Sequence, residues 1–139
     1  GYVDAEAEVE IVSAQEQRHP LESITPCATL AELQLIKEAV KRVRVSAELK
    51  RYIVDVVRAT REASSVTLGA GPRGSLALTK AAQALALIDG EAFVRPEHIH
   101  ELAVAVLAHR LALDPQAKFA GSSASAIVEH IVQTLPVPA

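Results

Sequence analysis

The chain has 139 residues, a net charge of −3 and a single cysteine, so an internal disulfide framework is excluded. Half of the residues are hydrophobic and 22% are charged, which is typical of a globular protein and excludes a disordered one. The 25 alanines and 15 leucines far outnumber the two phenylalanines and two tyrosines, and because Ala and Leu favour helices, an all-β fold is excluded as well.

The first predicted element is a helix over residues 4–18, with Asp4 as its N-cap. A connector over 19–28 follows, marked by Pro20 and Pro26. The connector predicts two parts, a linking helix and connector over 1–28 and a helical domain over 29–139.

The helical domain opens with the capping box Thr29-Leu30-Ala31-Glu32, which starts a helix that fades near Val43. Ser46 starts the next helix. Residues 62–72 are rich in Ser, Thr, Gly and Pro, which predicts a loop with a short extended piece at 66–68. The stretch 72–88 is apolar around most of its circumference, which predicts a central, buried helix with Gly90 as its left-handed cap.

Two further helices follow, one starting at Pro96 and the last after Ser122 or Ser123, with a brief turn from Asp114 to Gly121 between them. The predicted fold is therefore all-α: a bundle of about five core helices preceded by one peripheral helix. The predicted extended pieces are too short to form a sheet.

Residues Gly69 to Gly74 spell G-A-G-P-R-G, which formally matches a dinucleotide-binding fingerprint. That motif requires a βαβ unit, which is absent from the pattern, and a phosphate-binding P-loop would need Lys where Ser75 stands. What remains is Arg73 in the first turn of a helix that starts at Pro72. Because a cation is disfavoured at the positive end of a helix, Arg73 gains if it and the first-turn N–H groups share a phosphate. The alternative is that Arg73 pairs with Glu62 or points into solvent.

A basic face is predicted over residues 37–61, where eight Lys and Arg side chains face only three acidic ones. Such a face can bind nucleic acid or an acidic partner, or lie solvated or between domains. The overall acidic charge and the scarcity of aromatic residues make nucleic acid an unfavoured partner. The scattered histidines predict no metal site, and no nucleophile motif predicts a catalytic residue.

No apolar run approaches the roughly 18 residues of a membrane span, and no signal peptide opens the chain. With the single cysteine, these features predict a cytoplasmic protein without a membrane partner. Because the chain contains no Met, we expect it to be a piece of a longer protein.

Several runs of the sequence together resemble the C-terminal helical lid of MoxR-type AAA+ ATPases. The most specific is L-G-A-G-P-R-G-S-L-A-L (68–78), which matches the family's sensor 2 motif. The others are G-Y-V-D-A-E-A-E (1–8), V-R-A-T-R (57–61), L-A-L-I-D-G (85–90), F-V-R-P-E-H-I (93–99) and H-R-L-A-L-D-P (109–115). The chain departs from the family pattern at Gly71, where Ser is usual, and at Val3, where Pro is usual.

The resemblance implies that Arg73 is the sensor 2 arginine, which with Gly71 and Pro72 would form the nucleotide-binding site and reach the γ-phosphate of ATP. It also implies ATP and Mg²⁺ in the full-length protein, with none held by this fragment alone. The implied partners are the protein's own AAA+ core, further copies in a ring, commonly a hexamer, and a protein with a von Willebrand factor A domain. The implied activity is chaperone-like maturation of protein complexes.

Without the Walker motifs, the fragment is expected to be inactive as an ATPase, although the full-length protein would hydrolyse ATP. Arg58 and Arg61 are weaker candidates for contacts near the nucleotide. Two alternatives stay open: a stand-alone helical binding module that uses the basic face, and a related lid of the magnesium chelatase or replicative helicase type.

Overall fold

The computed structural model describes residues 2–15 and 19–138. The chain divides into two compact units, Gly1–Gln34 and Leu35–Ala139. The division falls within the helix α2 (Leu30–Arg42). The boundary predicted near residue 28 stays a prediction.

The first unit holds α1 (Ala5–Gln15), the short 3₁₀ helix η1 (Pro20–Ser23) and the start of α2. Asp4 Oδ1 accepts a hydrogen bond from the Ala7 N–H at 2.8 Å, which confirms the predicted cap. Residues 16–18 of that predicted helix lie outside the described residues. The predicted capping box is present, because the Thr29 N–H donates to Glu32 Oε2 at 2.7 Å and the Glu32 N–H donates to Thr29 Oγ1 at 3.2 Å.

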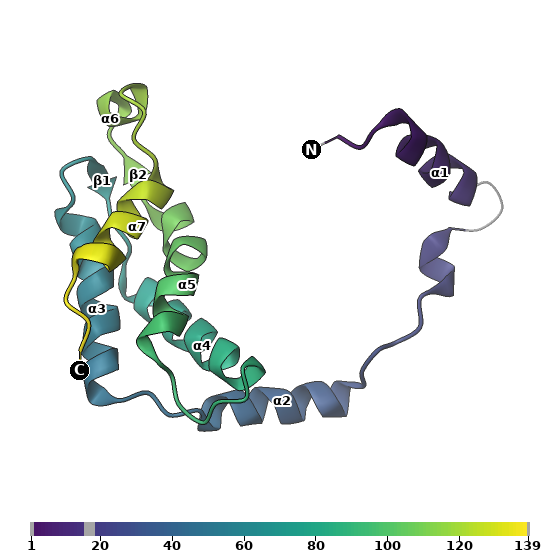
Figure 1. Ribbon diagram of the computed structural model, residues 1–139, viewed down its shortest axis with the longest axis horizontal. Helices are drawn as coiled ribbons and strands as arrows, with labels where there is room; N and C mark the ends of the chain where they lie inside the picture. Colours follow the sequence, from purple (N-terminus) through teal and green to yellow (C-terminus); the bar gives the residue numbers. More distant parts are fainter. Residues whose placement is uncertain (1, 16–18, 139) are drawn as a thin grey trace. The chain divides into compact units, whose positions relative to one another are not determined.

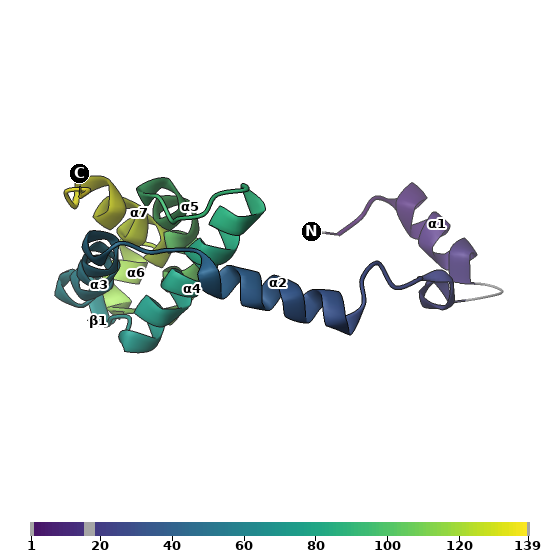
Figure 2. The same cartoon turned by 90° about the horizontal axis from the view of Figure 1, so that it is seen from below.

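The second unit contains the remaining elements (Figures 1 and 2). They are α3 (Ala47–Glu62), β1 (Val66–Leu68), α4 (Pro72–Ile88), α5 (Pro96–Leu107), η2 (Ala108–Arg110), β2 (Ala112–Leu113), α6 (Pro115–Phe119) and α7 (Ala124–Thr134). The caps of α3 and α7 are the predicted serines: Ser46 Oγ accepts from the Leu49 N–H and Ser123 Oγ from the Ala126 N–H, both at 3.1 Å. Gly90 has a φ of 76°, as its predicted left-handed cap requires.

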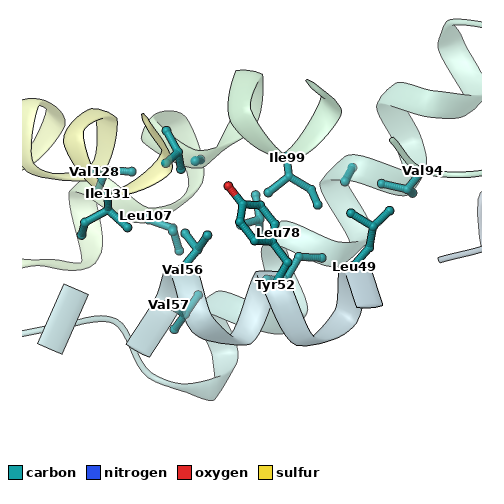
Figure 3. Packing of buried hydrophobic residues seen from close by; sticks show 14 of the residues in the cluster. Leu49, Tyr52, Val56, Val57, Leu78, Val94, Ile99, Leu107, Val128 and Ile131 are labelled. Carbon is teal, nitrogen blue, oxygen red and sulfur yellow. The ribbon is translucent and has the colours of Figure 1, made fainter. Parts of the chain in front are cut away.

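The core lies among α3, α4, α5 and α7, so the predicted all-α bundle is confirmed (Figure 3). Its fully buried large side chains come from these four helices: Ile53, Val56, Val57, Leu78, Ile99, Leu107 and Val128. α2 contributes no buried residue among those described.

The prediction that the helix at 72–88 is central and buried is correct for one side of the helix only. Its buried residues, Gly74, Leu78, Ala82 and Ala86, form one stripe at intervals of four residues. Leu76 and Ile88 are 62% and 81% exposed. The cause is that α4 packs chiefly against α5 and α3, which leaves its other face uncovered within the described chain.

The prediction that no sheet forms is also wrong. β1 and β2 pair in an antiparallel, two-stranded sheet with Val66 opposite Leu113 and Leu68 opposite Ala112. The Asp114 N–H donates to Ser65 O at 3.0 Å, and Thr67 Oγ1 donates to Ala112 O at 3.0 Å. A two-stranded ribbon is marginal alone, and this one is supported by α3, against which β1 packs.

The free energy of unfolding should fall at alkaline pH because of Tyr52 in α3. Its hydroxyl lies 2.8 Å from His100 Nε2 of α5, and burial raises its pKa. Unfolded Tyr ionises near pH 10, and the folded chain holds the proton more tightly. The free energy of unfolding that protonated Tyr52 contributes is therefore complete below about pH 10 and is lost as the pH rises through the folded pKa. Urea unfolding between pH 8 and 11 should show this loss in the wild type and a shallower one in Tyr52→Phe. Equal slopes would contradict the assignment.

Candidate functional site

The loop that joins β1 to α4 is held by two consecutive residues of α3. Thr60 Oγ1 accepts a hydrogen bond from the Ala70 N–H at 3.0 Å and donates to Val57 O at 2.6 Å. Arg61 Nε donates to Ala70 O at 2.7 Å. Thr60 and Ala70 are 0% and 1% exposed. Because both backbone polar groups of Ala70 are paired with α3, the loop and the helix that follows it are fixed to α3.

Gly69 lies directly against the backbone of α3. A Cβ at this position would lie 2.7 Å from Arg61 Cγ and 2.8 Å from both Arg61 Cα and Arg61 N. Two of these atoms belong to the helix backbone and cannot rotate away. Gly71, two residues later, has no atom within 4 Å of its own Cβ position. Close approach therefore requires glycine at position 69 but not at position 71.

The first turn of α4 presents Arg73 to solvent. Gly71 occupies the N-cap with an extended backbone and no side-chain hydrogen bond, and Pro72 occupies the first helical position as predicted. Pro72 has no N–H, and the Gly74 N–H is donated to Gly71 O at 2.7 Å. The sequence predicted that Arg73 and the N–H groups of the first turn share a phosphate. Because of Pro72 and the bonded Gly74 N–H, few of these N–H groups are free to do so.

The side chain of Arg73 is exposed and has no ion-pair partner among the residues the structure describes. The alternative in which Arg73 pairs with Glu62 is therefore absent from this structure, and the solvent-facing alternative describes its present state. An exposed, unpaired arginine is free to bind an anion at small conformational cost.

A pocket of about 610 Å³ brings the three predicted site residues together. Its lining consists of Leu68, Gly69, Gly71, Pro72, Arg73, Gly74 and Arg110. Sequence reasoning missed Arg110. The residue stood in the run H-R-L-A-L-D-P, and both the unpredicted pairing of β1 with β2 and the packing of α5 on α4 bring that run beside the loop.

The two weaker candidates differ in their surroundings. Arg61 uses Nε to hold Ala70 O, which gives it a structural role in fixing the loop. Arg58, one turn earlier on α3, is exposed. A role for either residue near a nucleotide stays a prediction.

The fold brings only some of the basic residues of segment 37–61 together. Lys41, Arg42, Arg44 and Lys50 line one pocket of about 740 Å³ where α2 ends and α3 begins. Lys41 pairs with Glu38 at 2.6 Å, and Arg51 pairs with Asp55 at 3.1 Å, so acidic neighbours neutralise part of the face. The Lys41 ammonium also lowers the pKa of Glu38. The function of the basic face as a contact surface stays a prediction.

Over residues 2–15 and 19–138, no helix is both long and apolar enough to cross a membrane. The same residues bring together no group of three His, Cys, Asp or Glu side chains suited to hold a metal ion.

A family model described as an AAA lid domain matches residues 58–131, a span that runs from Arg58 in α3 to Ile131 in α7. The chain belongs to the AAA lid domain family. The matched span contains the Gly69–Gly71 loop, Arg73 and Arg110, so every residue of the pocket belongs to the lid.

Two curated relatives of this lid are named as MoxR proteins. The chain is 31% identical over 147 residues to chaperone MoxR1 of Mycobacterium tuberculosis, covering 99% of this chain and 38% of that one. It is 31% identical over 108 residues to the MoxR protein of Paracoccus denitrificans, covering 68% and 32%. It is 42% identical over 138 residues to the uncharacterised protein YeaC of Bacillus subtilis, covering 99% and 43%. The lid therefore spans less than half the length of these relatives.

The fold has a counterpart among solved structures. A crystal structure from Cytophaga hutchinsonii, of a protein that carries an ATPase assignment, matches with a TM-score of 0.83 and 27% identity over all of this chain and 45% of that one. The resemblance to the lid of a MoxR-type AAA+ ATPase is thus confirmed.

Proposed function

We propose that this lid senses ATP bound to an AAA+ core through Arg73, the sensor 2 arginine, and couples hydrolysis to chaperone-like remodelling of protein complexes. The observation that carries the proposal is the position of Arg73: it is unpaired, exposed and at the start of a 17-residue helix, in a pocket with no acidic lining residue. Guanidinium groups and helix N-termini both favour phosphate.

The anchoring of the loop explains how a contact at Arg73 would move the lid. Ala70 is tied to α3 through Thr60 and Arg61, and α4 begins two residues after it. A force on Arg73 therefore acts on α3 and α4 together. When the γ-phosphate leaves, the lid would lose this attachment and change its position relative to the nucleotide.

The ATP and Mg²⁺ of this proposal are bound by the core, which also supplies the hydrolytic machinery. The lid supplies a positive charge near the γ-phosphate, where negative charge must be stabilised during phosphoryl transfer. We further propose that the protein acts in the cytoplasm as a homo-oligomeric ring, commonly a hexamer in MoxR-type ATPases, with a von Willebrand factor A domain protein as partner. The isolated lid is expected to hydrolyse no ATP.

The test is ATP turnover by the full-length protein with Arg73→Ala. Because a hydrogen bond to a charged group is lost, turnover should fall about tenfold or more. Lys80→Ala is the matched control, since Lys80 is an exposed cation on the same helix outside the pocket lining. Its turnover should stay at the wild-type level. Unchanged turnover in Arg73→Ala, with the wild type active, would overturn the proposal.

A further inference from the structure

We infer that Arg110 is a second phosphate-binding residue of the Arg73 pocket and that the two arginines hold the same phosphate chain. The inference rests on the proposed function, because it takes the ligand of Arg73 to be a nucleotide triphosphate. It assigns a ligand contact to a residue outside the sensor 2 motif, in the short helix η2 that follows α5.

The backbone fixes the segments that carry the two arginines to each other. Arg110 is the last residue of η2, and β2 begins two residues later at Ala112. Ala112 lies opposite Leu68 of β1, which immediately precedes Gly69. Each arginine is therefore within a few residues of the same strand pair, and the pocket that both line is built into the lid.

The side chain of Arg110 is held at Nε, and its end has no partner among the residues that the structure describes. Arg110 Nε donates to Val106 O at 2.8 Å, which leaves the two terminal Nη groups for other acceptors. Its Cδ lies 3.9 Å from the position that a Cβ on Gly74 would occupy. The Arg110 stem therefore lies beside the first turn of α4, at an ordinary van der Waals distance from the Cβ position of Gly74, the residue after Arg73.

The positively charged residues of the pocket favour an anionic ligand. Arg73 and Arg110 are its only charged lining residues, and no carboxylate among the seven lining residues compensates them. Two guanidinium groups on one pocket give it a positive potential, which favours an anion that can hydrogen-bond to them. A phosphate chain fits best, because its oxygens match guanidinium forks and its several charges suit two cations. A volume of about 610 Å³ accommodates a ligand of this size.

The test measures the affinity of the full-length protein for a non-hydrolysable ATP analogue in Arg110→Gln. Gln keeps an N–H for Val106 O but removes the charge. We expect the affinity to fall about tenfold, as for a lost charged hydrogen bond. His109→Ala is the matched control, because His109 Nδ1 also contacts the carbonyl four residues earlier, Ala105 O at 3.2 Å, and lies outside the pocket lining. Its affinity should be unchanged.

Two further variants separate the possible failures. Arg110→Lys should retain more of the affinity than Arg110→Gln, since it keeps the charge but lacks the guanidinium fork. An equal loss in Arg110→Lys and Arg110→Gln, with a lower unfolding temperature in both, would make Arg110 a structural cap of α5 and overturn the inference. Unchanged affinity in Arg110→Gln with a loss in Arg73→Ala would overturn the inference and leave the proposed function standing. Unchanged affinity in both would overturn the inference, and the turnover of Arg73→Ala would then decide the proposed function.

Discussion

The substitution Gly69→Ala is expected to lower the free energy of unfolding of this chain by about 2–4 kcal/mol, the sum of an overpacked site and weakened loop hydrogen bonds. The new Cβ would lie 2.8 Å from Arg61 Cα and Arg61 N, which belong to the backbone of α3 and cannot move without the helix. The loop must then shift away from α3. That shift lengthens both hydrogen bonds at Ala70: the one that its N–H donates to Thr60 Oγ1 and the one that its carbonyl accepts from Arg61 Nε.

Gly71→Ala is the matched control for this prediction. It introduces the same methyl group two residues later, where no atom lies within 4 Å and the φ of −94° is ordinary for Ala. Because Gly71 is the N-cap of α4 and Ala is a poorer N-cap than Gly, its free energy of unfolding should fall by no more than about 1 kcal/mol, less than in Gly69→Ala. Urea unfolding of both variants provides the comparison. Equal stabilities would show that Gly69 is not required for close packing against α3.

Thr60→Val is expected to cost about 1–3 kcal/mol of unfolding free energy, the penalty for a buried donor without a partner. Val has nearly the shape of Thr, so packing in the core is retained. The Ala70 N–H, however, loses the hydroxyl acceptor that holds it to α3. Because Thr60 is fully buried, water cannot replace the lost hydroxyl.

Thr60→Ser separates the hydrogen bonds from the packing. Ser keeps the hydroxyl and loses the methyl group, so it should retain the loop geometry at a smaller cost from the cavity. Hydrogen exchange at the Ala70 amide measures the effect directly: exchange should accelerate in Thr60→Val and stay slow in Thr60→Ser. Slow exchange in Thr60→Val would contradict the proposed anchoring.

The helices of this lid were predictable because their start and end signals are local. Ser46, Pro72 and Ser123 each begin the helix that they were expected to begin, and Gly90 has the left-handed conformation predicted for it. Such caps depend on hydrogen bonds between residues two to four positions apart. Arg73 could also be selected locally, since a cation in the first turn of a helix is unfavourable without an anion.

The features that were missed depend on contacts between distant residues. β1 and β2 are only three and two residues long, and their pairing joins segments more than 40 residues apart. Arg110 reaches the pocket through that pairing and through the packing of α5 on α4. The exposed side of α4, with Leu76 and Ile88, depends on which helices surround it, and periodicity alone does not give their number or position.

The most direct test of the proposed sensing role is a structure of the full-length protein with a non-hydrolysable ATP analogue. The Arg73 guanidinium should lie within about 3 Å of a γ-phosphate oxygen, the ordinary length of a charged hydrogen bond. The loop Gly69–Gly71 should stay bound to α3 in that complex. A γ-phosphate fully coordinated by other residues, with Arg73 pointing into solvent, would contradict the assignment of Arg73 as the nucleotide sensor.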